Sequence, residues 1–449
     1  MDLNRRDFII KSTVTGAGLS VMPFNVLKGS DDRVARLGFI GVGSRGTGHL
    51  RGILNRDDID VPAICDIDEQ NALQAQKMVH DAGKGRADVY TNGPSDYLRL
   101  VERDDLDGII ISTPWEYHAE QGVAGMKAGK YVALEIPAAI TLKGCWDLVN
   151  ASESTGMPCM LLGNTCYQRD VMAVLNMIRQ GLFGEMIHAQ CGYQHNLYSA
   201  LFFENARFGP GAGDRNRSPN WRTQHYVKRN GLLYPDHGAG AVGHWLNINR
   251  GNRYLSLSAA STKARGLSNY IKEHGGEDNP HADTHFRQGD IVTATLTTAN
   301  GETVIVIHDT TLPRGDNNKA FRAQGTNGLW QVEANRICLE GRTPQHTWES
   351  FEPGYQDEFD SSIWKRHGRE AQGAGHGGKD WFVRNAFVES IKRKVQPPID
   401  VYDAATIAAI VALSEQSIAE GGTAVPFPDF TRGKWMNNKP IFLPEELGY

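Results

Sequence analysis

Short apolar runs alternate with helix-like stretches over the first third of the chain. Residues 35–40 and 106–112 are apolar runs of strand length, and residues 69–82 read as a helix. Strands that are apolar on both faces and separated by helices are typical of a parallel sheet. The pattern continues with strands at 61–65, 131–135 and 158–162 and helices at 96–103, 119–128 and 145–155. We therefore predict an α/β, doubly wound parallel sheet (Rossmann-type) over residues 31–162, with its ligand crevice at the carboxyl ends of the strands.

The second part of the chain, residues 163–449, has a different texture. Residues 186–193, 291–298 and 303–308 are strand-like, and an Asn300-Gly301 turn joins the last two as a hairpin. Helices are predicted at 171–179, 381–394 and 402–420, and a long polar loop at 204–230. Neighbouring strands with helices segregated around them predict a C-terminal α+β domain on a large, open, mostly antiparallel sheet.

A glycine-rich loop follows the first strand directly. The stretch 41–46 (GVGSRG) fits the dinucleotide fingerprint, and residues from Thr47 onward can continue as a helix. Gly41 allows the tight turn, Gly43 lets the backbone approach a pyrophosphate, and Gly46 lets the helix lie close to the strand. The free N–H groups and the dipole at the start of that helix favour the phosphates of a cofactor.

An acidic residue stands where the same fingerprint requires one. Asp66 ends the second strand, about 20 residues after Gly46. A carboxylate there binds the ribose 2′-hydroxyl and repels the 2′-phosphate of NADP. The order of strand, glycine loop, helix, strand and acid therefore predicts NAD as the cofactor. The alternative is that Asp66 only ends a strand in a turn.

The N-terminal segment, residues 1–30, differs from the rest of the chain. It contains Arg5-Arg6, followed by a mildly apolar run of small residues from Ser12 to Met22. This pattern is typical of a twin-arginine export signal, which predicts a periplasmic or secreted protein. An ordinary amphipathic helix is the alternative.

Charge and cysteine content limit the classes of partner. The 449 residues carry a net charge of −5, which favours neither nucleic acid nor an anionic membrane. No apolar run is long enough to span a bilayer, so we expect no stable membrane insertion and no nucleic-acid partner. The six cysteines lack metal-type spacing, and we expect free thiols because twin-arginine substrates fold in a reducing compartment.

These features together resemble the Gfo/Idh/MocA oxidoreductase family. The resemblance rests on the glycine loop, Asp66, Thr113-Pro114 with His118, and the stretch Glu135-Ile136-Pro137. Where this chain has Glu135-Ile136-Pro137, many dehydrogenases of that family have Glu-Lys-Pro, and the lysine is a catalytic acid or base. Ile136 in its place argues against sugar-alcohol dehydrogenation by the usual lysine route.

Longer motifs resemble glycoside hydrolase family 109, in which exported NAD-dependent enzymes cleave glycosides, typically of N-acetylgalactosamine. The motifs are 163–172 (GNTCYQRDVM), 192–197 (GYQHNL), 230–238 (NGLLYPDHG) and 246–251 (LNINRG). With Gly41, Gly43 and Gly46, the NAD-binding residues implied by the resemblance are Ser44, Arg45, Asp66, Trp115 to His118, Glu135, Ile136 and Asn164. The implied sugar-binding residues are Tyr193, Arg222, Tyr234 and His237. The chain departs from the family pattern at 313–316 (PRGD), because the family places a tyrosine after the Pro-Arg pair. The acidic Asp316 in this stretch would change the sugar contacts.

The mechanism implied by this resemblance returns the cofactor to its starting state in every cycle. NAD⁺ takes a hydride from C3 of the sugar, the C2 proton becomes acidic, and the C1 substituent leaves. Water then adds to C1 and the hydride returns to C3. This cycle suits an exported protein, because the partners that reoxidise free NADH are mainly cytosolic.

Three residues are candidates for the proton transfers. His237 is the first choice of base for the C3 hydroxyl, because imidazole titrates near neutrality. Tyr193 and Tyr167 are candidates for the base at C2, provided that a basic neighbour or the nicotinamide charge lowers their pKa from about 10. The alternatives are a histidine bonded to a loop carbonyl and tyrosines that only pack in the core.

Two further polar groups remain. The histidines and acids between His274 and His285 do not have the spacing of a metal site, so we predict a polar surface loop and no metal. His376, in a glycine-rich stretch before the helix at 381–394, is a candidate for a place beside the active cleft.

The sequence therefore predicts an NAD-dependent glycosidase that acts on a glycoside substrate. By resemblance we also expect a homo-oligomer, because open sheets of this family's second domain often pair between subunits. One alternative is an oxidoreductase that releases a 3-keto sugar. The other is a non-catalytic, NAD-bound sugar-binding protein.

Overall fold

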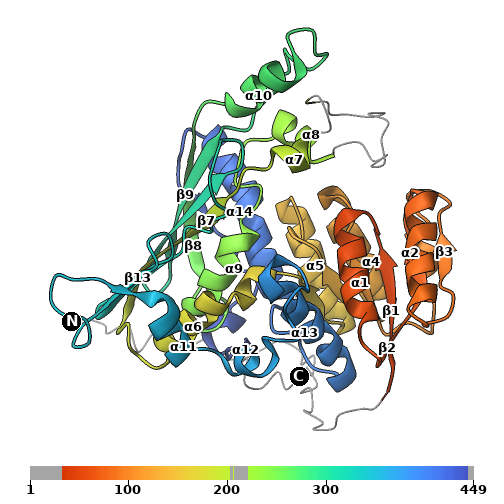
Figure 1. Cartoon of the computed structure of the whole chain (residues 1–449), viewed down its shortest axis with the longest axis horizontal. Helices are drawn as coiled ribbons and strands as arrows, with labels where there is room; N and C mark the ends of the chain where they lie inside the picture. The colour runs from red at the N-terminus through yellow and green to blue at the C-terminus, as the bar shows by residue number, and fades with distance from the viewer. Residues whose placement is uncertain (1–32, 203–205, 207–220, 443–449) are drawn as a thin grey trace, which may run out of the picture.

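The computed structural model describes residues 33–202, 206 and 221–442. The predicted export segment, residues 1–30, and most of the predicted loop at 204–230 lie outside the described residues. In the described part, two sheets lie on opposite sides of the molecule, with α9, α13 and α14 between them (Figure 1). No helix in these ranges is long and apolar enough to cross a membrane.

The first sheet is parallel throughout, which confirms the predicted doubly wound fold. Its six strands follow the order β3-β2-β1-β4-β5-β6, so the strand order reverses between β1 and β4, where doubly wound sheets bind their ligands. The strands are β1 (Ala35–Ile40), β2 (Ile59–Cys65), β3 (Asp88–Tyr90), β4 (Gly108–Ile111), β5 (Tyr131–Leu134) and β6 (Cys159–Leu161). The helices are α1 (Ser44–Leu54), α2 (Glu69–Asp81), α3 (Tyr97–Val101), α4 (Trp115–Lys127) and α5 (Leu142–Thr155).

Helix α1 lies against the strand that precedes it because of a glycine. A Cβ atom on Gly46 would lie 2.0 Å from the carbonyl oxygen of Gly41, so any larger residue would push the helix away. Gly43, in contrast, has open space around the position of a Cβ. The helix begins at Ser44 and continues through Thr47, in agreement with the prediction.

The second sheet has nine strands in the described part of the chain, in the order β14-β13-β12-β11-β7-β10-β9-β8-β15. Only β7 and β10 pair in parallel, and the predicted hairpin of β9 and β10 is present. The sequence prediction missed β8 and the short strands β11 to β15, which have few apolar residues in a row. The strands are β7 (Met186–Gln194), β8 (Tyr254–Ser261), β9 (Ile291–Thr298), β10 (Thr303–Asp309), β11 (Arg322–Gly325), β12 (Gly328–Gln331), β13 (Arg336–Leu339), β14 (Glu349–Ser350) and β15 (Val425–Pro426).

The second part of the chain contains the remaining helices, and several of them differ from the sequence prediction. Helix α8 (Trp221–Lys228) lies within the predicted loop at 204–230, and α10 (Gly266–Gly275) contains His274, which we predicted in a loop. The prediction also missed α9 (Asp236–Trp245), whose glycines lower its intrinsic helix propensity. The remaining helices are α6 (Arg169–Arg179), α7 (Tyr198–Leu201), α11 (Gln356–Glu358), α12 (Ser362–His367), α13 (Lys379–Arg393) and α14 (Val401–Ala419), with single turns at Asn164–Tyr167, Phe351–Tyr355, His376–Gly378 and Lys434–Met436.

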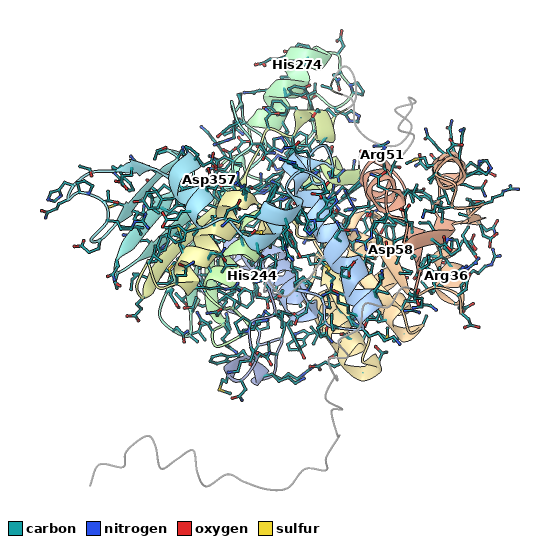
Figure 2. All side chains as sticks on the ribbon, turned by 60° about the horizontal axis from the view of Figure 1, so that its bottom comes forward. Arg36, Arg51, Asp58, His244, His274 and Asp357 are labelled. Atoms are coloured by element: carbon teal, nitrogen blue, oxygen red, sulfur yellow. The ribbon has the colours of Figure 1, made fainter. Side chains whose placement is uncertain are left out.

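The C-terminal helices return to the first sheet and hold the two parts together. Helix α14 packs against α5 on one side and β8 on the other (Figure 1). Helix α13 packs against α1, and its Lys392 Nζ lies 2.6 Å from an oxygen of Asp58, which Figure 2 labels. The same carboxylate accepts a hydrogen bond from Arg56 at 2.8 Å. Contacts between residues far apart in sequence therefore hold the C-terminal helices against the first sheet.

Candidate active site

A cavity of about 1030 Å³ lies where the carboxyl ends of the first sheet face the second sheet. Gly41, Gly43 and Asp66 line one end of it, as expected for the crevice of a doubly wound sheet. Tyr193 and His237, from the second part of the chain, line the other end. The cavity therefore joins the predicted dinucleotide site to the predicted sugar site.

The dinucleotide end has the features that bind a pyrophosphate and a ribose. Helix α1 has no side-chain cap at its N-terminus, so its first N–H groups are available to a ligand beside the open space at Gly43. The Asp66 carboxylate is held at the end of β2 by the N–H groups of Val42, at 2.8 Å, and Asp68, at 2.9 Å. Burial raises the pKa of Asp66, and these two hydrogen bonds oppose that shift. These residues fit a dinucleotide.

Three of the predicted NAD-binding residues do not line the cavity. Gly46 instead lies against Gly41, as described above. His118 is buried, with Nδ1 2.8 Å from the carbonyl oxygen of Pro137 and Nε2 2.7 Å from that of Thr113, so it holds together the loops after β4 and β5. Trp115 is also buried and packs edge-on against Tyr234, with ring centroids 4.8 Å apart. The other predicted NAD-binding residues line the cavity, namely Gly41, Gly43, Ser44, Arg45, Asp66, Glu116, Tyr117, Glu135, Ile136 and Asn164.

Arg45 is the centre of a charged network in the cavity wall. Its Nε donates to Glu135 at 2.6 Å, and its Nη1 donates to Asp380 at 2.6 Å. His49 Nε2 lies 2.6 Å from the same oxygen of Glu135. Burial alone would raise the pKa of Glu135, but the Arg45 charge and the His49 hydrogen bond outweigh burial and hold it well below its ordinary value. Both carboxylates therefore stay ionised and neutralise the guanidinium.

Asp380 joins this network to the first turn of α13, a contact that sequence reasoning missed. Its Oδ2 lies 2.8 Å from Nδ1 of His376, and its Oδ1 accepts a hydrogen bond from Asn164 at 2.6 Å. Burial opposes ionisation, but the bonds with His376 and Arg45 hold the pKa of Asp380 far below its ordinary value. His376 lines the cavity, in agreement with its predicted place beside the cleft.

The sugar end is built by the close approach of α9 to β7. A Cβ atom on Gly238 would lie 2.6 Å from Cβ of Cys191 and 2.7 Å from the backbone nitrogen of Gly192. Because glycine stands there, the start of α9 reaches the end of β7. The rings of His237 and Tyr193 then lie with their centroids 4.1 Å apart.

His237 lies at this end of the cavity and stays uncharged. Burial lowers its pKa well below the ordinary value, and the nearby charges of Lys319 and Lys379 lower it further. The imidazole is therefore neutral at pH 7, with one nitrogen available as an acceptor. The nearest hydrogen-bonding side chain is the Thr165 hydroxyl, whose oxygen lies 3.4 Å from Nδ1.

Tyr193 forms a hydrogen-bonded pair that the sequence did not reveal. Its hydroxyl oxygen lies 2.7 Å from Nδ1 of His195, two residues further along the chain. Burial raises the pKa of Tyr193 above its ordinary value, so the side chain is a neutral phenol in this structure. Burial also lowers the pKa of His195, with Lys319 adding to the effect, and its neutral ring can accept the phenol proton.

The other two predicted sugar-binding residues hold each other. Arg222 Nε donates to the Tyr234 hydroxyl at 2.9 Å, and the guanidinium stacks on the ring of Trp221 at 4.3 Å. Both Arg222 and Tyr234 line the cavity, as do Tyr193 and His237. The structure therefore brings the four predicted sugar-binding residues together.

Tyr167 is a correction to the predicted catalytic set. Its side chain is fully buried and does not line the cavity. The ring lies parallel to that of Phe382 at 6.2 Å and edge-on to that of Phe442 at 5.2 Å. It is a core residue, because the turn that carries it points it toward α13 rather than toward Tyr193.

Two lysines in the cavity wall were not predicted. Lys319 lies in the loop between β10 and β11, and Lys379 is the first residue of α13. Both line the cavity. The neighbouring Asp316, which we expected to alter the sugar contacts, instead faces Arg314 at 3.5 Å and does not line the cavity.

The other candidate groups lie away from the cavity. His274 is on α10 at an outer end of the molecule, as Figure 2 shows, and hydrogen-bonds the carbonyl oxygen of Tyr270. Among the described residues, no three His, Cys, Asp or Glu side chains are grouped as metal ligands. The six cysteines are free thiols, as expected.

Comparison with known proteins assigns both parts of the chain. Residues 35–162 match the model of an oxidoreductase family with an NAD-binding Rossmann fold, and residues 167–437 match the C-terminal domain of glycosyl hydrolase 109. A glycosyl hydrolase family 109 protein of Stenotrophomonas maltophilia is 46% identical, with 98% of each chain covered. An α-N-acetylgalactosaminidase of Tannerella forsythia is 42% identical, with 98% of this chain and 100% of that protein covered.

The fold is also shared with solved structures of more distant proteins. Levoglucosan dehydrogenase in complex with NADH and L-sorbose superposes with a TM-score of 0.64 at 18% identity, covering 88% of this chain and 100% of that one. The two halves thus match a dinucleotide-binding fold and a glycosidase domain, and the relatives align over nearly the full length. The chain belongs to glycoside hydrolase family 109.

Proposed function

We propose that this protein is an NAD-dependent glycosidase that cleaves α-N-acetylgalactosaminides or related glycosides by a redox-neutral elimination and addition. The observation that carries the proposal is one cavity in which the dinucleotide end meets a neutral His237 packed against the ring of Tyr193. The α-N-acetylgalactosaminidase relative, at 42% identity, supports the sugar class.

The cofactor end supports NAD. Asp66 offers a carboxylate to the ribose, and the N-terminus of α1 offers N–H groups to the phosphates. When bound, NAD would supply a reversible hydride acceptor for C3 of the sugar. Ile136 lines the cavity beside Glu135 and cannot exchange a proton, so the acid–base groups must come from the second part of the chain.

His237 is the proposed base for the C3 hydroxyl. Its burial keeps the ring neutral, so it can accept the hydroxyl proton as that carbon is oxidised and return it at the end of the cycle. Arg222 and Tyr234 are the proposed contacts to the sugar hydroxyls.

Tyr193 and His195 together are the proposed acceptors of the C2 proton. As the Tyr193 oxygen takes the C2 proton, its own hydroxyl proton can pass across the 2.7 Å hydrogen bond to Nδ1 of His195. This route removes the need for a free phenolate, which burial disfavours.

The test is turnover in deuterated water without added NAD. The purified protein is incubated with a panel of α- and β-nitrophenyl glycosides, with His237→Asn as the control. Aglycone release with deuterium at C2 of the sugar supports the proposal and identifies the sugar and the anomer. Release without deuterium leaves a glycosidase but refutes proton removal at C2. A reduced cofactor and a 3-keto sugar, without release, would establish the oxidoreductase alternative.

We also propose that the protein is exported through the twin-arginine route and forms a homo-oligomer. The Arg5-Arg6 pair and the open second sheet support these two proposals. Loss of export in an Arg5→Lys, Arg6→Lys variant, measured by cell fractionation, tests the first. A light-scattering mass equal to one chain would refute the second.

A further inference from the structure

Two lysines that line the cavity, Lys319 and Lys379, lack the paired carboxylates that hold Arg45. Lys319 is only 7% exposed, donates to the amide oxygen of Asn317, and has its Nζ 4.8 Å from the ring centroid of Tyr193. Lys379 Nζ donates to the amide oxygen of Gln168 at 3.3 Å. Neither forms an ion pair with a carboxylate within residues 33–202 and 221–442.

The carboxylates that line this part of the cavity are already used. Glu135 and Asp380 both bind Arg45, which leaves their charge neutralised by that guanidinium. Asp316, on the same loop as Lys319, lies toward Arg314 and outside the cavity lining. The Lys319 ammonium is buried with only amide and ring partners, which is unfavourable unless an anion joins it.

The electrostatics of the cavity are consistent with this shortage of negative charge. Burial lowers the pKa of Lys319 to about 7, and the charge of Lys379 contributes to that shift. Burial also lowers the pKa of Lys379, and the charges of Asp170 and Asp380 oppose that shift without forming an ion pair with its ammonium. A bound anion would raise both values and keep both lysines protonated.

The position of the two lysines indicates which anion they serve. Lys319 Nζ lies over the ring of Tyr193, which places it at the sugar end, and Lys379 lines the same cavity, where its charge also lowers the pKa of His237. The phosphates of a dinucleotide are expected at the N-terminus of α1, where Gly43 leaves open space.

We propose that the glycoside substrate carries an anionic substituent on its sugar, a carboxylate or a sulfate ester, which Lys319 and Lys379 bind together. This inference rests on the proposed glycosidase function. It narrows the substrate class from neutral amino sugars to acidic or sulfated ones.

The experiment compares matched pairs of nitrophenyl glycosides on the holoprotein. One pair is the α-N-acetylgalactosaminide and its 6-sulfate, and the other is the α-galactoside and the α-galacturonide. We expect kcat/KM for one anionic member to exceed that for its neutral partner by about tenfold or more, the factor of one charge-assisted hydrogen bond. The preferred pair shows whether the group is a sulfate or a carboxylate, and raised ionic strength should reduce the preference.

Variants locate the preference within the cavity. Lys319→Met and Lys379→Met should lower the ratio of anionic to neutral turnover by about tenfold each, with turnover of the neutral member as the internal reference. Lys319→Arg should keep most of the preference for the anionic glycoside. This variant keeps the positive charge, so it tests the inference even if a methionine variant does not fold. Lys77→Met, on the exposed face of α2, is the matched control and should leave the ratio unchanged.

Calorimetric binding of free N-acetylgalactosamine 6-sulfate and galacturonate to the holoprotein decides the inference independently of turnover. The inference is supported if the anionic sugars bind more tightly than the neutral ones and if the methionine variants weaken that binding. This support would stand even if no glycoside were cleaved, because the lack of cleavage would refute only the glycosidase. Equal or better use of neutral glycosides overturns the inference and leaves the glycosidase standing. Loss of bound NAD in the variants, with an unchanged sugar preference, would assign the lysines to the cofactor's phosphates and also overturn it.

Discussion

The glycine at position 238 should control both the stability and the activity of this protein. In Gly238→Ala, the new Cβ would lie 2.6 Å from Cβ of Cys191 and 2.7 Å from the backbone nitrogen of Gly192. Neither neighbour is the end of a flexible side chain, so α9 must move away from β7. That movement would separate His237, near the start of α9, from Tyr193, near the end of β7.

The magnitude follows from the size of the clash. Ordinary carbon contacts are near 3.5–4 Å, so α9 must shift by about 1 Å. Such overpacking costs about 1–3 kcal/mol, of which the better helix propensity of alanine returns about 0.5–1 kcal/mol. A misplacement of about 1 Å at a catalytic group can lower the rate by about 100-fold. We therefore expect a modest loss of stability and a large loss of kcat/KM.

A matched control lies in the same helix. In Gly243→Ala, the nearest atom to the new Cβ is Cβ of Ile248 at 3.9 Å, an ordinary contact. This variant should gain about 0.5–1 kcal/mol in free energy of unfolding and keep its activity. Urea unfolding followed by tryptophan fluorescence measures the first quantity, and kcat/KM on a cleaved nitrophenyl glycoside the second. If Gly238→Ala behaves like Gly243→Ala, the close approach of α9 to β7 does not build the site.

Three further results are expected. His237→Asn should lower kcat/KM by about 10²–10⁴-fold with bound NAD unchanged, and the acid limb of the wild-type pH profile should lie below pH 6.5 because the pKa of His237 is lowered. Arg45→Met should lower the free energy of unfolding by about 3–5 kcal/mol, because two buried carboxylates lose their cation. Burial raises the pKa of Asp236 from 3.8 to about 7, so the folded protein keeps a proton that the unfolded chain loses, and stability falls as pH rises through this window. Asp236→Asn should abolish that fall. Unfolding curves at about pH 4 and pH 8 would then show that the variant gains up to about 4 kcal/mol in free energy of unfolding, relative to the wild type, between the two pH values.

Some site residues could be predicted because the pattern that marks them is local. Gly41, Gly43 and Asp66 belong to one strand–loop–helix–strand unit, whose geometry follows from short-range chain conformation. Tyr193 and His237 were predicted through motifs that resemble those of a known family. Tyr167 was predicted on the same basis and was wrong, because a motif does not say which way each side chain points.

The sequence by itself determined the parallel nucleotide-binding sheet, the NAD-type acid at its second strand, and the family. These depend on runs of apolar residues and on glycine spacings that lie close together in the chain. Only the tertiary structure decided that Asp380 binds Arg45, 335 positions away in sequence, and that His195 binds Tyr193. It alone brought Lys319 and Lys379 into the cavity. Contacts of this kind depend on how separate elements pack, which no local pattern of residues encodes.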